Sequence, residues 1–111
     1  MIVEHRTYQL KPGKVNAYFE CYQQTGMAIQ LDYLLQPLGY YCTEIGPLNQ
    51  IIHLWGYTDL NERQRCRNRL KQDPRWAGYV AMIMPLIEHQ ESRILTPAGF
   101  FSPMAVAYRP A

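Results

Sequence analysis

Hydrophobic and polar residues alternate along NQIIHLWGYT, residues 49–58, and this pattern predicts a β-strand. Side chains two residues apart share a face of a strand. Ile52 and Leu54 therefore form a purely apolar face, whereas His53 and Trp55 lie on the opposite face and combine an imidazole with a large ring. The apolar face is suited to packing under helices, so we expect the face with His53 to be the uncovered one.

Three other segments have the composition of strands, because they are rich in β-branched and aromatic residues or are bounded by turn signals. They are residues 2–10 (IVEHRTYQL), 38–45 (LGYYCTEI) and 91–97 (ESRILTP). The turn-like sequence GPLN at 46–49 joins the second of these strands to the strand at 49–58 and predicts a hairpin.

The segments between the strands carry apolar residues at helical spacing. The first helix is expected to begin at Lys14, to be interrupted near Gly26 and to resume over residues 27–35, before Pro37. This spacing covers most of the chain between the first two strands, and it predicts a helical connection there.

The connection after the third strand contains two further predicted helices. Asp59 is suited to cap a helix over residues 60–71, and Asp73 to cap one that begins at Pro74. The apolar stripe of this last helix continues to Ile87, so we expect the helix to reach that residue with a kink at Pro85. His89 lies near the end of this predicted helix, where it would cap the last carbonyl groups or be solvated or, alternatively, ligate a haem.

The predicted order β-α-β-β-α-β is that of an α+β protein with the ferredoxin-like fold. In this fold a four-stranded antiparallel sheet has the spatial order 4-1-3-2, and helices cover one face. The other face would carry His53, Trp55 and Tyr57. Two such sheets packed face to face would bury these rings, so the pattern predicts a homodimer that encloses a barrel.

Composition and charge narrow the function. The net charge of the 111 residues is only +2, and the basic run Arg63–Lys71 lacks aromatic residues spaced for base stacking, so we expect a solvated helix face and no nucleic-acid partner. The longest strongly apolar run has twelve residues and contains a proline, which argues against a membrane partner. The three cysteines are widely spaced, and no secretory signal is apparent, so we expect a cytoplasmic protein.

Several segments together resemble the NIPSNAP family of dimeric α/β-barrel proteins. They are RTYQLKPGK (6–14), GYYCTEIGPLNQIIHLWGY (39–57), DPRWAGY (73–79) and QESRIL (90–95). The resemblance implies a barrel domain over residues 1–97, followed by a C-terminal tail at 98–111. Broader relatives by fold include cofactor-free monooxygenases, isomerases, cyclases and haem-handling enzymes. We expect the tail to pack on the body or on a partner because Phe100, Phe101 and Tyr108 are apolar.

The candidate site combines side chains from neighbouring strands. Arg6 and Tyr8 share a face with His53, so His53 is predicted to act as a general base in a solvent-reachable cavity while Arg6 and Tyr8 stabilise an oxyanion. The predicted ligand-binding residues are Trp55, Tyr57, Glu44 and Arg93. Which face of strand 38–45 lines the cavity stays open.

These residues predict a small-molecule-binding protein. The first hypothesis is an enzyme without metal or organic cofactor, acting by oxygenation, isomerisation or cyclisation on an aromatic, polyketide-like or enolic substrate. The alternative is a non-catalytic module that binds a hydrophobic ligand or haem. No paired carboxylates, nucleophile triad, phosphate loop or metal-ligand cluster is apparent in the sequence.

Overall fold

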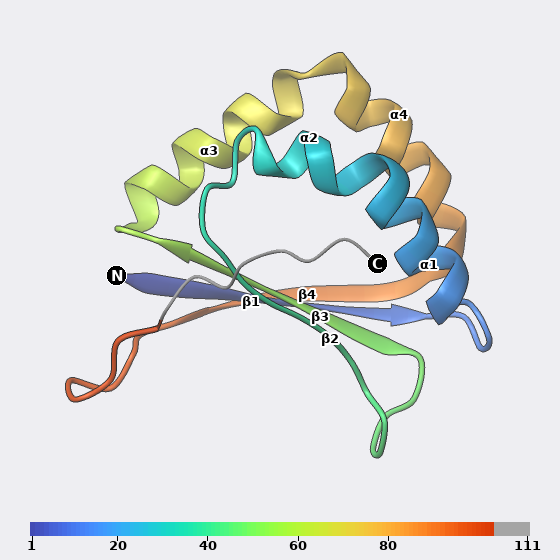
Figure 1. Cartoon of the computed structure of the whole chain (residues 1–111), viewed down its shortest axis with the longest axis horizontal. Coiled ribbons are helices and arrows are strands. Elements are labelled where there is room, and N and C mark those ends of the chain that lie inside the picture. The colour runs from blue at the N-terminus through green and yellow to red at the C-terminus, as the bar shows by residue number, and fades with distance from the viewer. Residues whose placement is uncertain (104–111) are drawn as a thin grey trace.

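The computed structural model describes residues 1–103 and has one antiparallel sheet with helices on one face (Figure 1). The strands are β1 (Ile2–Leu10), β2 (Pro37–Cys42), β3 (Gln50–Tyr57) and β4 (Ile87–Leu95), in the spatial order β2-β3-β1-β4. All three strand pairs are antiparallel. The predicted α+β ferredoxin-like fold and its strand order are therefore confirmed.

Two helical connections arch over the sheet (Figure 1). The first runs without a break through α1 (Val15–Cys21), a π-helical segment η1 (Tyr22–Gly26) and α2 (Met27–Leu31). The second contains α3 (Leu60–Gln72), α4 (Pro74–Ile83) and the short 3₁₀ turn η2 (Met84–Leu86). Within residues 1–103, no helix has the length and apolar character needed to cross a membrane.

The predicted helix caps are present at the start of α3 and α4. The side chain of Asp59 accepts a hydrogen bond from the backbone N–H of Glu62 at 2.8 Å, and Asp73 accepts one from the backbone N–H of Arg75 at 2.9 Å. Each cap satisfies a backbone donor that has no partner inside its helix, so local sequence determines where both helices begin.

The end of α4 differs from the prediction. The helix stops at Ile83, Pro85 lies in the 3₁₀ turn, and β4 begins at Ile87. Proline has no N–H for the helical ladder, and a strand that begins this early can pair with β1 from Leu10 to Val3. His89 therefore lies on β4 opposite Gln9 with an exposed side chain, so the predicted position at a helix end and the capping role are wrong.

The prediction that placed the His53 face of β3 in the open was also wrong. His53, Trp55 and Tyr57 are 1–2 % exposed and lie under the helices, whereas Ile52 and Leu54 face the open side and are half-buried. The helix layer supplies partners for the polar edges, as when the Tyr18 hydroxyl meets His53 Nε2 at 3.2 Å. A ring with a polar edge can be buried when such a partner is present.

The open face carries an apolar groove. Its floor comes from all four strands, and the first described residues of the tail close one side. The residues that line it are Val3, His5, Leu38, Leu54, Leu95, Thr96, Pro97, Phe101 and Pro103. Phe100 is 95 % exposed, and Tyr108 lies outside the described residues, so packing of the whole tail stays a prediction.

Candidate functional site

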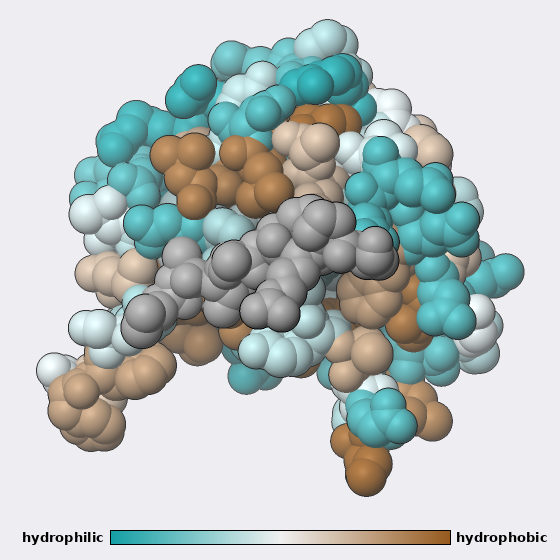
Figure 2. All heavy atoms as spheres, in the orientation of Figure 1, coloured by the Kyte–Doolittle hydropathy of each residue, from teal (hydrophilic) through white to brown (hydrophobic). Residues whose placement is uncertain are grey.

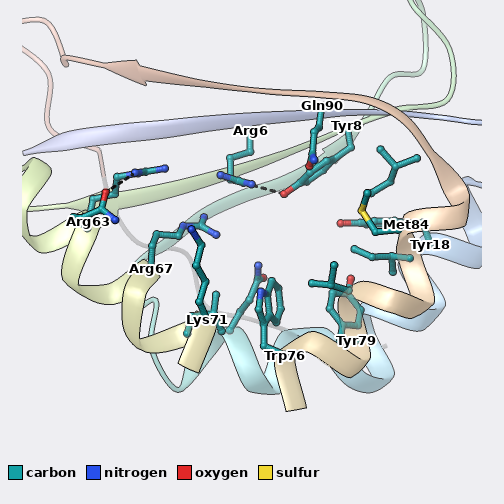
Figure 3. A pocket seen from close by; sticks show the side chains of 16 residues that line it. Arg6, Tyr8, Tyr18, Arg63, Arg67, Lys71, Trp76, Tyr79, Met84 and Gln90 are labelled. Carbon is teal, nitrogen blue, oxygen red and sulfur yellow. Dashed lines mark hydrogen bonds between the residues drawn. The ribbon is translucent and has the colours of Figure 1, made fainter. Parts of the chain in front are cut away.

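A cavity of about 300 Å³ lies between the sheet and the helices, on the face opposite the apolar groove. Figure 3 shows its walls: Arg6 and Tyr8 come from β1, a basic row from α3, and aromatic and apolar side chains from α4 and η2. Of the predicted catalytic residues, Arg6 and Tyr8 line this cavity and His53 does not.

Arg6 and Tyr8 form a hydrogen-bonded pair at the cavity wall. The Arg6 Nε–H donates to the Tyr8 hydroxyl oxygen at 2.9 Å, and the guanidinium carbon lies 5.7 Å from the centre of the Tyr8 ring. Tyr8 thus accepts from Arg6, and its own O–H donates to no group in residues 1–103. A donor held in this way can bind an oxygen atom of a ligand.

Glu4 is the buried carboxylate that anchors the arginines of the site. Its side chain is fully buried, and one oxygen accepts hydrogen bonds from Arg6 and Arg63, both at 2.9 Å, and from Ser92 at 2.5 Å. The other oxygen accepts from Tyr57 at 3.3 Å and lies 3.3 Å from Arg67 Nη2.

Electrostatics keeps Glu4 ionised. Burial, the largest influence, would raise its pKa, but the hydrogen bond from Arg63, the charge of Arg67, the Ser92 hydrogen bond and the charge of Arg6 together lower the pKa to about 2. Sequence analysis did not select Glu4. Its position two residues before Arg6, on the same face of β1, is the signal that could have identified it.

The basic run of α3 is divided between two faces of the helix. Arg63, Arg67 and Lys71 follow one another at intervals of four residues and all line the cavity, whereas Arg65 and Arg69 are exposed and do not. Arg67 is only 7 % exposed. The prediction of a solvated face is therefore wrong for Arg67 but not for Lys71, which is exposed. The three residues line one cavity because residues four apart lie on the same side of a helix.

The opposite wall is aromatic and apolar. Trp76 and Tyr79 of α4 have ring centres 5.2 Å apart, and Ile83, Met84 and Ile87 continue this surface. The cavity thus has a cationic side and an apolar side (Figure 3). This polarity is the feature of the site that bears most directly on its ligand.

His53 lies in the aromatic core. Its ring meets four tyrosine rings edge-on, with centres 4.8–6.1 Å away: Tyr8, Tyr18, Tyr22 and Tyr40. Burial, with a smaller contribution from the charges of Arg6 and Arg67, lowers the pKa of His53 to about 3, so the imidazole is neutral and weakly basic at pH 7. The prediction that His53 lines a solvent-reachable cavity and bonds to Arg6 or Tyr8 is therefore wrong.

The four predicted ligand-binding residues also lie outside the cavity lining. Trp55 and Tyr57 are in the core. Glu44 is exposed in the loop between β2 and β3. Arg93 pairs with His5 across the strands, which places it on the open face, where it bonds to Glu91 at 3.0 Å. For strand 2, Tyr40 pairs with His53 and so faces the helices.

The described residues offer no metal centre. No group of three or more His, Cys, Asp or Glu side chains within residues 1–103 is arranged to hold a metal ion. Cys21, Cys42 and Cys66 are free thiols. The polar and aromatic groups that the cavity presents to a ligand are guanidinium, ammonium, carboxamide, phenol and indole groups.

The fold defines a class of small α+β proteins with a ferredoxin-like sheet. A solved antibiotic biosynthesis monooxygenase shares the fold, with a TM-score of 0.63 at 10 % identity over 88 % of this chain and 99 % of that chain. Within the class, the chain belongs to the NIPSNAP family, whose model matches residues 3–103. The family resemblance stated from the sequence is confirmed.

Two relatives illustrate the relationship. A NIPSNAP-family structure of unknown function from Agrobacterium tumefaciens has a TM-score of 0.90 and 41 % identity and covers 94 % of each chain. The NipSnap homologue of Dictyostelium discoideum is 36 % identical over 94 residues, which are 85 % of this chain and 41 % of that protein. The chain thus spans about two-fifths of that curated relative.

Proposed function

We propose that this protein binds a small organic molecule in the helix-side cavity and that the Arg6–Tyr8 pair contacts an oxygen atom of that molecule. The observation that carries the proposal is the Tyr8 hydroxyl. It accepts from Arg6 and has its own hydrogen available at the wall of a cavity that is lined by aromatic, aliphatic, cationic and carboxamide side chains. Pockets that combine apolar walls with a few convergent polar groups are typical ligand sites.

The test compares two tyrosine variants. Tyr8→Phe removes the hydroxyl at the cavity, and Tyr41→Phe removes one from a side chain that is 57 % exposed and lies outside it. Loss of one hydrogen bond of about 1.4 kcal/mol weakens binding about tenfold. We expect that loss for Tyr8→Phe and unchanged binding for Tyr41→Phe, measured by calorimetric titration with phenylacetate and phenylacetamide.

Native mass spectrometry of the purified protein adds a direct measurement. A molecule retained in the cavity would be detected with the wild-type protein, and a smaller amount of it would be detected with Tyr8→Phe. The proposal fails if neither probe binds and no molecule is retained. It also fails if the two variants lose affinity equally.

A second candidate is an enzyme that needs no organic cofactor and acts on an enolic substrate. The Arg6–Tyr8 pair favours it, because two donors at one wall would stabilise the oxyanion left when an acidic C–H loses its proton. His53 is a poor candidate for the base, being buried behind Tyr8 and Tyr18 with a pKa of about 3. The geometry therefore supports binding more directly than catalysis. Exchange of the acidic proton of acetylacetone into D₂O, faster with wild type than with Tyr8→Phe, would favour the enzyme.

A further inference from the structure

The cavity has more positive charge than its surroundings neutralise. Arg6, Arg63, Arg67 and Lys71 line it, and no Asp or Glu among residues 1–103 does. Glu4, behind the wall, is the carboxylate that pairs with the three arginines. Four cations and one carboxylate leave a formal charge of +3, and a charge of one sign in a partly enclosed site attracts ligands of the other sign.

Arg67 has hydrogen-bonding capacity left over. Its side chain is more than nine-tenths buried, yet Nε and Nη2 donate no hydrogen bond to any described residue. Nη2 does lie 3.3 Å from a Glu4 oxygen. Nε and Nη2 form one edge of the guanidinium group, and such an edge matches the two oxygens of a carboxylate. A buried donor such as Nε, which has no partner among the described residues, is costly unless something else binds it.

Lys71 extends the same cationic wall. It is exposed and forms no ion pair with a residue in the described chain, yet its side chain points towards Arg67 and the cavity (Figure 3). A lysine that bound only water would be expected to keep away from a neighbouring guanidinium, because like charges repel. An anion bound between Arg67 and Lys71 would attract both side chains and outweigh the repulsion between them.

Resting on the proposed small-molecule function, we infer that the ligand is an organic carboxylate with a compact aromatic or apolar body. The carboxylate binds between Arg67, Lys71 and the Arg6–Tyr8 pair, and the body packs on Trp76 and the apolar wall. The volume of about 300 Å³ is at the small end for ligand pockets, which suits a single compact molecule. The two walls also fix its orientation.

The test compares ligands that share a benzyl group and differ in the polar group attached to it. Phenylacetate, neutral phenylacetamide and benzyl phosphate are titrated calorimetrically into the full chain at low and high salt. We expect phenylacetate to bind at least about tenfold more tightly than the amide and its affinity to fall as salt rises, because screening weakens charge attraction. The amide serves as the reference for the same body without charge.

The matched variants are Lys71→Gln and Arg65→Gln, which remove one positive charge each from α3, inside and outside the cavity. Lys71→Gln should weaken phenylacetate binding about fivefold or more and leave the amide unchanged, while Arg65→Gln should change neither by more than twofold. Arg67→Gln should have a larger effect than Lys71→Gln, and a melting curve shows whether it still folds. Lys71 is exposed, so its variant is decisive even if Arg67→Gln does not fold.

The outcomes separate the two proposals. Equal binding of amide and carboxylate overturns the carboxylate inference while the small-molecule function stands. Preference for benzyl phosphate overturns the carboxylate assignment in favour of a phosphate ester. Equal losses in Lys71→Gln and Arg65→Gln show a general charge effect and also overturn it. Binding of no probe overturns the carboxylate inference, and together with the absence of any retained molecule in native mass spectrometry it removes the proposed function itself.

Discussion

At the scale of single residues, Glu4 is stable as a buried anion because donors surround both of its oxygens. Arg6, Arg63 and Ser92 contact one oxygen, and Tyr57 and Arg67 approach the other. Removing one partner of a buried ion pair leaves the rest uncompensated, which typically costs about 3–5 kcal/mol. Glu4 thus holds the arginines of the cavity wall in place, a positioning role.

The first prediction concerns acid. The pKa of Glu4 is about 2 in the folded protein against an ordinary 4.5, so its stabilisation is complete above pH 4.5 and is lost as pH falls towards 2. The pKa of His53 is about 3 against 6.5, so the unfolded chain takes up a proton below pH 6.5 that the folded chain refuses, and stability falls towards pH 3. Both groups therefore lower the free energy of unfolding as the pH falls.

Urea denaturation at intervals from pH 7 to 3 measures this loss, which we expect to reach about 6–7 kcal/mol for the two groups together, because one pKa unit corresponds to about 1.4 kcal/mol. Glu4→Gln should be less stable at pH 7 and should lose less further stability below pH 4.5. Glu91→Gln, which removes an exposed carboxylate, should follow wild type. A free energy of unfolding that stays constant from pH 6.5 to 3 would contradict both pKa assignments.

The sequence predicts part of the site at this scale. Alternation correctly places Arg6, Tyr8 and His53 on one face of neighbouring strands, as the register of β1 against β3 confirms. It does not reveal which face the helices cover, because that depends on partners such as Tyr18 that arrive from another element. Hydropathy alone favoured the wrong face, since polar edges are buried readily once they are hydrogen-bonded.

At the scale of elements, the π-helical segment η1 brings the first connection close to α4. Gly26, its last residue, is buried, and a Cβ there would meet three carbons of the Tyr79 ring, two of them at 2.6 and 2.7 Å. A π-helical segment adds a residue to a helical turn and often lies near a functional site. The predicted interruption at Gly26 is wrong, because the helical connection continues through this residue, and the extra residue in the turn has no signature in the hydrophobic pattern.

The second prediction compares two glycine substitutions in helical segments. Gly26→Ala should destabilise the protein by about 1–3 kcal/mol, the usual cost of overpacking a core. Gly78→Ala in α4 has open space around its new methyl group and should stabilise by about 0.5–1 kcal/mol. Urea denaturation of both variants against wild type measures the difference. Equal effects would show that the Gly26–Tyr79 contact relaxes without cost.

At the scale of the whole molecule, the open face has the character of an interface. Its groove is apolar, and two segments project below the sheet on either side: the loop between β2 and β3 and the turn after β4 (Figure 1). Figure 2 shows hydrophobic side chains at the tips of both, where Ile45 is 93 % and Phe100 is 95 % exposed. Exposed apolar surface of this kind marks contact sites.

The third prediction is therefore a homodimer formed through the open face. Sedimentation at micromolar concentration should show a dimer, and Leu54→Asp, which places a charge in the groove, should give a monomer. Met82→Asp on α4, at a side chain that is 54 % exposed, should remain dimeric. A wild-type monomer would contradict this expectation, which rests on the apolar groove of the open face and not on the aromatic residues of β3.

The position of the cavity determines the expected number of ligands bound per chain. Its walls come from β1, β4 and the helices of one chain, and the groove expected to meet a partner is on the other side of the sheet. Each chain therefore carries a whole site. The expected stoichiometry is one ligand per chain, with a simple hyperbolic isotherm and no cooperativity between the members of a dimer.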